Sequence, residues 1–491
     1  MFTLEAEDNR KQAVNVSRSA WLALGILSST LLVVFFSETM LLPAIPEIMR
    51  NFTIPYGTAA WIFSAYLIVA AVMTPIAGKM SDIYGKKKVL LILLVLYGAA
   101  TAAGAFSNNI SFLLATRIVQ GVGLAAVPAA FSLLRDAFPP AKLAIAVGVF
   151  GSAYSAGSVV GLLAGASIIQ NFGWHSTFLF IVPFAALAAL LIARFVKENK
   201  QPGFERFQGQ PEKSHTHIDM KGALTLSATI ITFLLALTLI ESGIRADNLL
   251  QIITAFAASA ISLVAFVAIE RRTAAPLLDL RLLKHRILLL SYIIVTASGV
   301  TMYLAYPSIV QLVRSPIPLG FGGDAVAAAN VQLPFMIMFL IFASVTPFII
   351  NKFGNVRPIM IGAIISSIGA FSLLLFHSSE SVVSTNLAIM AVGLSMIMTA
   401  SMNVVVSSSP REFVGISVGV GALFIFIGMS IGPALAGAYM EDKKTIEGVQ
   451  GSYPSPTSYD LVFLTSGLLA MVSLGFATIL QRRVARNEIS A

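Results

Sequence analysis

The sequence contains no cysteine and carries little charge. Asp, Glu, Lys and Arg make up 11% of its 491 residues, whereas soluble proteins contain about 25%. The lack of cysteine excludes disulfides, thiolate metal sites and cysteine nucleophiles. The low charge, together with 57% apolar residues, excludes an ordinary soluble domain and indicates a membrane protein.

Several functional motifs are also missing. No segment has the Gly-x-x-x-x-Gly-Lys-Ser/Thr spacing of a nucleotide-binding loop, and the apolar runs hold no nucleophile set or metal cluster. We therefore predict no enzyme activity, no cofactor and no metal; His215 and His217, in a polar linker, are expected to be solvated. The net charge of +9 lies mainly in short turns between apolar runs, so we predict no nucleic-acid partner. The polar start leads into an apolar run too long for a signal-peptide core, which predicts no cleaved leader.

Fourteen apolar runs approach or exceed the roughly 20 residues that cross a bilayer. They predict an all-α polytopic membrane protein with two six-helix bundles and two inserted helices. Most of the 32 Lys and Arg residues fall on one side if both termini are cytoplasmic, which predicts a multi-pass protein of the cell membrane with both ends inside. The predicted segments are a tail (1–20), a first bundle (21–196), a linker (197–219), an inserted pair (220–269), an amphipathic connector (270–287), a second bundle (288–481) and a tail (482–491).

A basic loop between the second and third spans, GKMSDIYGKKK, is the predicted cytoplasmic gate loop. Gly78 and Gly85 are expected to allow a tight turn. Asp82 can interact with a helix N-terminus or a cation. The three consecutive lysines Lys86, Lys87 and Lys88 are expected to hold the loop in the cytoplasm.

A glycine pattern recurs in the two halves at nearly the same offset, which predicts an internal repeat of six spans. Glycines four residues apart share one helix face and allow another backbone to approach closely. The predicted packing glycines are Gly157, Gly161 and Gly165 in the fifth span and Gly428 and Gly432 in the thirteenth.

Two ionisable residues stand out within the spans, Glu38 in the first and Arg117 in the fourth. Inserting such a group at the membrane centre costs about 2.5–3.5 kcal/mol, so each of the two residues is expected to have a functional or structural role. We predict that Glu38 gains and loses a proton while Arg117 holds its charged form. A fixed ion pair that only locks two helices is the alternative, and Glu38 could also lie near the outer interface.

Polar side chains in otherwise apolar spans are the candidates for a largely apolar substrate cavity. Each alone is more often a helix-to-helix hydrogen bond. The set comprises Tyr66, Gln120, Tyr154, Tyr303, Tyr306, Gln332 and Asn403.

Several motifs together resemble the 14-helix drug:proton antiporter group of the major facilitator superfamily. Besides the spans, gate loop and glycine-rich fifth span, they are Arg117-x-x-Gln120-Gly121, Trp174-His-Ser-Thr-Phe178 through Pro183, and Pro276-Leu-Leu-Asp-Leu-Arg281. The resemblance implies the major facilitator fold and efflux of small lipophilic or cationic compounds, driven by proton entry and alternating access. The implied partners are a small-molecule substrate, protons and the lipid bilayer, and we predict a monomer. Export of an endogenous lipid, siderophore or metabolite is the alternative, as is an uncoupled membrane binding or sensor protein.

The chain departs from the family pattern at two positions. The first-span aspartate of the family is Ser37 here, and the carboxylate follows at Glu38, about 100° around the helix. The proton role of Glu38 is therefore a hypothesis. In the family, proline follows the glycine that matches Gly161, but this chain has Leu162 there. The corresponding glycine of the thirteenth span, Gly432, is followed by Pro433.

Overall fold

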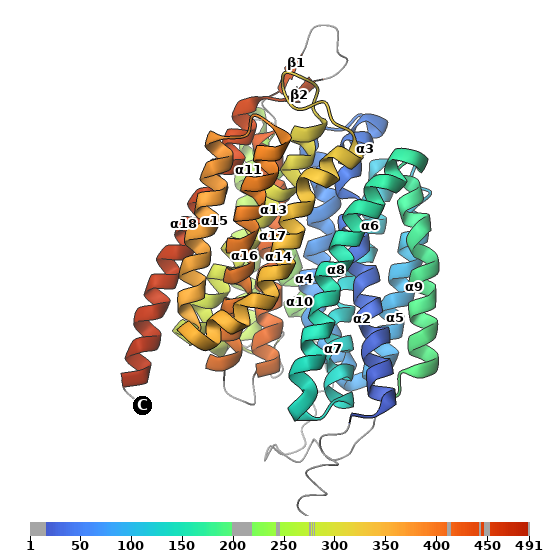
Figure 1. The fold of residues 1–491 in the computed structure, drawn as a ribbon, viewed down its shortest axis with the longest axis vertical. Helices are drawn as coiled ribbons and strands as arrows, with labels where there is room; N and C mark the ends of the chain where they lie inside the picture. The colour runs from blue at the N-terminus through green and yellow to red at the C-terminus, as the bar shows by residue number, and fades with distance from the viewer. Residues whose placement is uncertain are drawn as a thin grey trace, which may run out of the picture.

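The computed structural model describes residues 16–198, 219–241, 246–273, 276, 278, 280–409, 414–440, 443–445 and 452–489. Within these residues, 14 helical spans are long and apolar enough to cross a membrane. The prediction of an all-α protein with fourteen spans is confirmed. The first six spans lie on the right of Figure 1 and the last six on the left.

Seven spans come before the chain's midpoint, and two of them are interrupted. The first comprises α2 (Arg18–Thr39), the 3-10 turn η1 (Leu42–Ala44) and α3 (Ile45–Phe52); the others are α4 (Tyr56–Tyr84), α5 (Lys86–Gly104), α6 (Ile110–Leu124) with α7 (Ala126–Ala137), α8 (Pro140–Phe172), α9 (His175–Phe195) and α10 (Met220–Glu241).

The remaining spans are joined by a short connector helix and a small hairpin. In order they are α11 (Ala246–Glu270), connector α12 (Leu280–Lys284), α13 (Arg286–Arg314), α14 (Ala325–Phe353), α15 (Val356–Leu375), α16 (Glu380–Ser408), α17 (Val414–Tyr439), strands β1 (Lys443–Thr445) and β2 (Ser452–Pro454), and α18 (Pro456–Ile489). The strands pair antiparallel, with Lys444 opposite Tyr453. We call the end of the molecule where α2 begins the tail face, and the end that holds β1 and β2 the hairpin face (Figure 1).

Short polar side chains begin several of these helices. Ser17 accepts a hydrogen bond from the backbone N–H of Ala20 at the start of α2, and Asn109 and Asp324 do the same for α6 and α14. Each cap satisfies a backbone donor that has no partner within the helix. Local sequence therefore determines where these spans begin.

The gate loop is shorter than predicted, because α4 continues to Tyr84 and α5 begins at Lys86. The turn requires only Gly85, whose φ of 96° is disfavoured for residues with a side chain. The prediction that Gly78 forms part of the turn is wrong, because Gly78 lies inside α4. Asp82 is in the last turn of α4, and its side chain lies outside the part of the structure that is described.

The repeated glycines lie where two pairs of helices touch. A Cβ added to Gly157 would lie 2.5 Å from the carbonyl oxygen of Leu32 in α2, and one added to Gly165 would lie 2.6 Å from the Cα of Met40. In the second half, a Cβ on Gly432 would lie 2.6 Å from the backbone of Leu304 in α13, and Gly428 similarly meets Thr296. The fifth span thus contacts the first as the thirteenth contacts the ninth, which agrees with the repeat.

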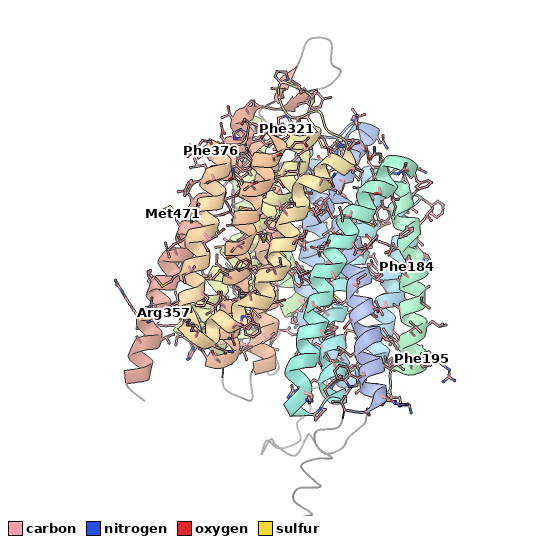
Figure 2. The ribbon with its side chains drawn as sticks, in the orientation of Figure 1. Phe184, Phe195, Phe321, Arg357, Phe376 and Met471 are labelled. Carbon is pink, nitrogen blue, oxygen red and sulfur yellow. The ribbon has the colours of Figure 1, made fainter. Side chains whose placement is uncertain are left out.

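Large apolar side chains also cover the outside of the molecule. Phe184, Phe376 and Met471 are 47%, 61% and 51% exposed, and Figure 2 shows all three on the perimeter of the bundle. In water such a surface would be unfavourable, whereas lipid tails accept it. This perimeter is the surface that faces the bilayer.

Two apolar clusters join the two bundles. One cluster connects the first bundle to the hairpin-face halves of α13 and α14, through residues such as Leu312 and Phe335. A second cluster joins α4 to α17 and includes Ile76 and Leu423. A third lies within the second bundle toward the tail face and includes Ile294, Ile359 and Val404. The two bundles therefore pack together near the hairpin face and also where α4 meets α17.

The close approach of α8 to α2 predicts the effect of enlarging one glycine. In Gly161→Ala, the new Cβ would lie 2.5 Å from the carbonyl oxygen of Phe36, so α8 must move away. We expect a loss of about 1–3 kcal/mol of stability, the usual cost of overpacking, measured as a lower unfolding temperature in detergent. The control is Gly148→Ala on the same helix, where no atom lies within 4 Å. Equal stability of the two variants would contradict the packing role.

Candidate functional site

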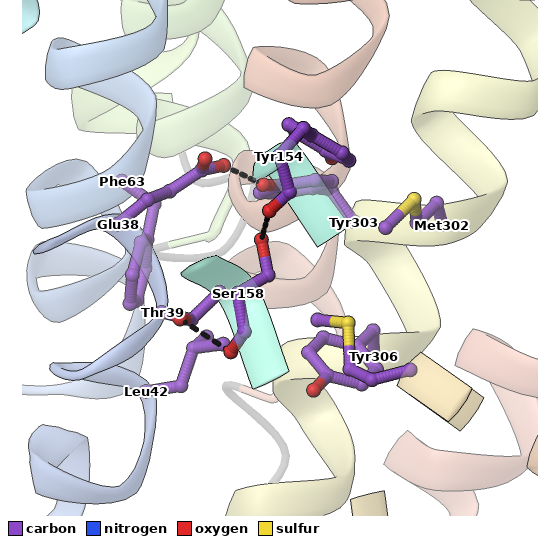
Figure 3. A pocket seen from close by; sticks show the side chains of 10 residues that line it. Glu38, Thr39, Leu42, Phe63, Tyr154, Ser158, Met302, Tyr303 and Tyr306 are labelled. Atoms are coloured by element: carbon purple, nitrogen blue, oxygen red, sulfur yellow. Dashed lines mark hydrogen bonds between the residues drawn. The ribbon is translucent and has the colours of Figure 1, made fainter. Parts of the chain in front are cut away.

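A small pocket lies between the two bundles, near the middle of the molecule (Figure 3). The first bundle contributes side chains from α2, η1, α4 and α8, and the second bundle contributes side chains from α13 and α14. Its ten lining residues include one carboxyl group and no basic side chain. They are Glu38, Thr39, Leu42, Phe63, Tyr154, Ser158, Met302, Tyr303, Tyr306 and Met336.

Glu38 lies one residue before the end of α2 and is 4% exposed. The helix stops there because Pro43 and Pro46 follow and lack the N–H groups that would continue its hydrogen bonds. Thr39 anchors this end of α2 to α8, since its hydroxyl donates to the carbonyl oxygen of Ser158 at 2.9 Å. The carboxyl is therefore held at the pocket wall by a helix end tied to its neighbour.

The Glu38 carboxyl bridges the two bundles. The hydroxyl of Tyr303, in α13, donates a hydrogen bond to Oε1 of Glu38 (Figure 3). The other carboxyl oxygen, Oε2, is buried and has no hydrogen-bond partner in the structure. The hydroxyl of Tyr306 is also buried and has no hydrogen-bond partner. A buried polar atom without a partner is costly, so both atoms are available to a ligand.

Arg117 does not pair with Glu38, which corrects the prediction of contact between them. Its guanidinium donates from Nε to the carbonyl oxygen of Ile62 at 3.1 Å and from Nη1 to Oε1 of Gln120 at 3.0 Å. It also lies over the ring of Tyr66, 4.2 Å from the ring centre. The amide of Gln120 in turn donates to Thr101 at 2.9 Å. The guanidinium is thus held by a carbonyl, an amide and a ring face within the first bundle, and it acts on Glu38 only at longer range.

The predicted cavity residues separate into three groups. Tyr154, Tyr303 and Tyr306 line the pocket, whereas Tyr66 and Gln120 belong to the network around Arg117. Gln332 donates to the backbone carbonyl of Tyr306 and so supports the wall from behind.

Asn403 lies away from the pocket. Its amide donates to the side-chain oxygen of Asn355 at 3.3 Å, and Asn355 immediately precedes α15 at the tail face. The prediction of Asn403 as a cavity residue is therefore wrong, because polarity within a span does not reveal depth along it.

Sequence reasoning missed most of the apolar lining. Phe63, Met302 and Met336 line the pocket, but the chain contains 33 Phe and 17 Met residues and nothing distinguishes these three. Ser158 had a usable signal, since it follows Gly157 on the helix that packs closely against α2.

Lys86 and Lys87 of the gate loop contact the ends of α7 and α9 and the start of the linker. Lys86 forms an ion pair with Asp136 of α7 at 2.5 Å, and its backbone N–H donates to Glu198 at 2.7 Å. The amine of Lys87 donates to the carbonyl oxygen of Ala193 at 2.7 Å. These bonds tie the turn between α4 and α5 to the ends of α7 and α9.

Further polar contacts between the bundles lie at the hairpin face. Arg314, at the end of α13, pairs with Glu47 at 2.8 Å and donates to the carbonyl oxygen of Pro43 at 2.8 Å. Gln170 of α8 donates to Asp324 at the start of α14, also at 2.8 Å. Together with the shared apolar cluster, these contacts close the hairpin end of the space between the bundles.

A metal centre finds no support in the described residues, which contain no group of three or more His, Asp or Glu side chains arranged to hold an ion. His215 and His217 lie outside the described residues. The chemistry of the pocket therefore comes from one carboxyl group, tyrosine hydroxyls and apolar surface.

The fold corresponds to that of a known class of membrane transporter. The Major Facilitator Superfamily model matches residues 27–433 and 321–490. The chain therefore belongs to the Major Facilitator Superfamily, a family of membrane transporters rather than enzymes.

Individual relatives are named as drug resistance, export or efflux proteins. The chain is 25% identical to the tetracenomycin C resistance and export protein of Streptomyces glaucescens, over 86% of this chain and 76% of that protein. It is 25% identical to the multidrug efflux pump LfrA of Mycolicibacterium smegmatis, over 85% of this chain and 80% of that protein. Multidrug resistance protein 3 of Bacillus subtilis is 30% identical over 64% of this chain, and the matched part spans 58% of that protein.

Solved structures support the same fold at lower sequence identity. The human organic anion transporter MFSD10 matches 94% of this chain and 100% of its own, with a TM-score of 0.63 and 15% identity. An auto-inhibited POT family peptide transporter matches 95% of this chain and 97% of its own, with a TM-score of 0.66 and 14% identity.

The environment of Arg117 predicts that lysine cannot replace it. A lysine keeps the positive charge, but all its donors lie on one nitrogen, and it has no planar group to stack on the Tyr66 ring while reaching both acceptors. For Arg117→Lys we expect a loss of about 1–3 kcal/mol, the usual contribution of hydrogen bonds to a charged group, measured as a lower unfolding temperature in detergent. The control is Arg135→Lys, an exposed arginine of the same bundle. If both variants unfold at the same temperature as the parent protein, the network does not depend on the guanidinium.

Proposed function

We propose that this chain is a proton-coupled efflux transporter for small lipophilic or cationic compounds, of the multidrug type. The observation that carries the proposal is the Glu38 carboxyl, which lines a pocket between the bundles and keeps one oxygen free of partners. The named relatives include multidrug efflux and resistance proteins, which supports this substrate class.

The composition of the pocket favours a lipophilic cation. A carboxylate without a basic neighbour in the lining attracts positive charge, and Phe63, Tyr154 and the two methionines offer polarisable apolar surface. Tyr306 adds a free hydroxyl. Such a lining accepts many shapes, because methionine side chains are flexible.

Antiport follows from competition for one group. The Glu38 carboxyl can be neutralised by a proton or by a bound cation, and a charged carboxylate left alone inside a membrane protein is unfavourable. Substrate binding would release the proton, and proton binding would release the substrate. Each state remains electrically compensated at the pocket.

Alternating access would use the contacts between the bundles. Glu38 belongs to the first bundle and Tyr303 to the second, so a ligand that displaces the tyrosine alters a contact between them. The tail face is proposed to be cytoplasmic, with both termini inside, because most Lys and Arg residues then lie inside. The Arg314 and Gln170 contacts would then close the extracellular side.

The proposed unit is a monomer built from the predicted bundles, linker (197–219), inserted pair and connector. One chain supplies the whole lining of the pocket, so transport needs no residue from a second copy. Gly85 with Lys86 and Lys87 would hold the cytoplasmic gate loop in place.

The test is proton-driven uptake of ethidium, a lipophilic aromatic cation, into proteoliposomes with an acidic lumen. Outward proton flow should drive ethidium inward through the parent protein, whichever way each molecule is inserted. In Glu38→Gln we expect uptake to fall at least about tenfold, because the amide neither exchanges a proton nor attracts the cation. The control is Glu380→Gln, a carboxyl at the start of α16 outside the pocket lining.

The other outcomes separate the alternatives. Unchanged uptake by Glu38→Gln would contradict the proton role of this residue. Uptake of neutral lipids or metabolites in place of cations would favour the endogenous exporter. Binding of ethidium without any transport by the parent would favour an uncoupled binding or sensor protein.

A further inference from the structure

The inserted pair α10 and α11 is attached to both bundles. Helix α10 packs against α4 of the first bundle and against α17 of the second. One apolar cluster contains Ile76 of α4, Leu226 and Ile230 of α10, and Leu423 of α17. The pair therefore covers the seam along which α4 and α17 meet.

A buried charge cluster lies at the tail-face end of this pair. Asp219 is 8% exposed, and its Oδ1 accepts a hydrogen bond from the backbone N–H of Gly222 at 2.8 Å, which caps α10. Its other oxygen, Oδ2, is buried and has no hydrogen-bond partner in the structure. Glu270, at the end of α11, is 4% exposed.

The two carboxyl groups converge on the first turn of α10. A Cβ added to Gly222 would lie 2.7 Å from Oε1 of Glu270 and in contact with Oδ2 of Asp219. Glu270 also accepts a hydrogen bond at 3.3 Å from the backbone N–H of Leu278, in the segment that leads to α13. Only a glycine leaves room for both carboxyl groups at this point.

Lys79 of α4 supplies the opposite charge. Helices α4 and α10 are in contact, and Lys79 lies within electrostatic range of both Asp219 and Glu270. The next residue, Met80, packs on the same apolar cluster as α10, which brings this part of α4 against the pair. Two buried carboxylates would be strongly unfavourable without such a cation, so the three side chains act as one unit.

We propose that α10 and α11 form a strap across the seam, fastened to α4 by Lys79, Asp219 and Glu270. The strap rests on the proposed alternating access, and it stabilises the conformation described here over one in which the tail-face halves of α4 and α17 are rearranged. The apolar face of α10 holds α17 while the charge cluster holds α4. Any change in the angle between these helices must break one of the two attachments.

Two substitutions weaken the charged attachment without removing the helix. Asp219→Asn deletes a negative charge but keeps a side chain that caps helices equally well. Gly222→Ala keeps every charge and pushes the two carboxyl groups away from the helix start. The control is Lys221→Gln, an exposed charge on the same turn of α10.

The measurement is the distance between spin labels, by pulsed electron resonance, in protein reconstituted in nanodiscs. The chain has no cysteine, so labels can be placed on introduced cysteines without a background. One pair, Phe106→Cys with Phe376→Cys, joins exposed positions of the two bundles at the hairpin face. The other, Phe195→Cys with Arg357→Cys, joins exposed positions at the tail face.

We expect the parent to populate two distances at each face. In Asp219→Asn and in Gly222→Ala, the population with the longer hairpin-face distance should increase by about fivefold or more, while Lys221→Gln matches the parent. Two parent populations that neither variant shifts, or a shift in Lys221→Gln as large as in the variants, would overturn the strap. A single distance in every protein, with and without ethidium, would instead contradict alternating access.

Discussion

A carboxyl group buried between two helix bundles is the constraint on which the rest of the structure depends. Glu38 cannot remain charged and alone inside a membrane, so a proton, a hydrogen-bond donor or a cation must compensate it. In this conformation the donor is Tyr303, which belongs to the opposite bundle. The ionisation of one group is thereby connected to the relative position of two large bodies.

The surrounding framework keeps this group in place. Proline residues end α2 just after Glu38, and the close contact of α8 with α2 at Gly161 leaves no room for a side chain between them. The related contact of α17 with α13, at Gly432, supports the helix that carries Tyr303. Rigid pairs of helices on each side concentrate movement at the interface between them, where the pocket lies.

Hydropathy was sufficient to predict the number of spans and the fold class, because twenty apolar residues are a local property of the chain. The importance of Glu38 and Arg117 was also predictable, since charges are costly in a span. Their partners were not, because pairing depends on depth and direction across helices distant in sequence. Arg117 finds a backbone carbonyl, that of Ile62, which no composition reveals. The gate turn was predicted too long, since one glycine with positive φ is enough to make it.

The central claim is that proton and substrate compete for Glu38. The most direct test is to titrate the purified protein with ethidium in a weakly buffered detergent solution and follow the pH during binding. The account predicts proton release that saturates together with binding and disappears in Glu38→Gln. Binding without proton release, or the same release in Glu38→Gln, would contradict it.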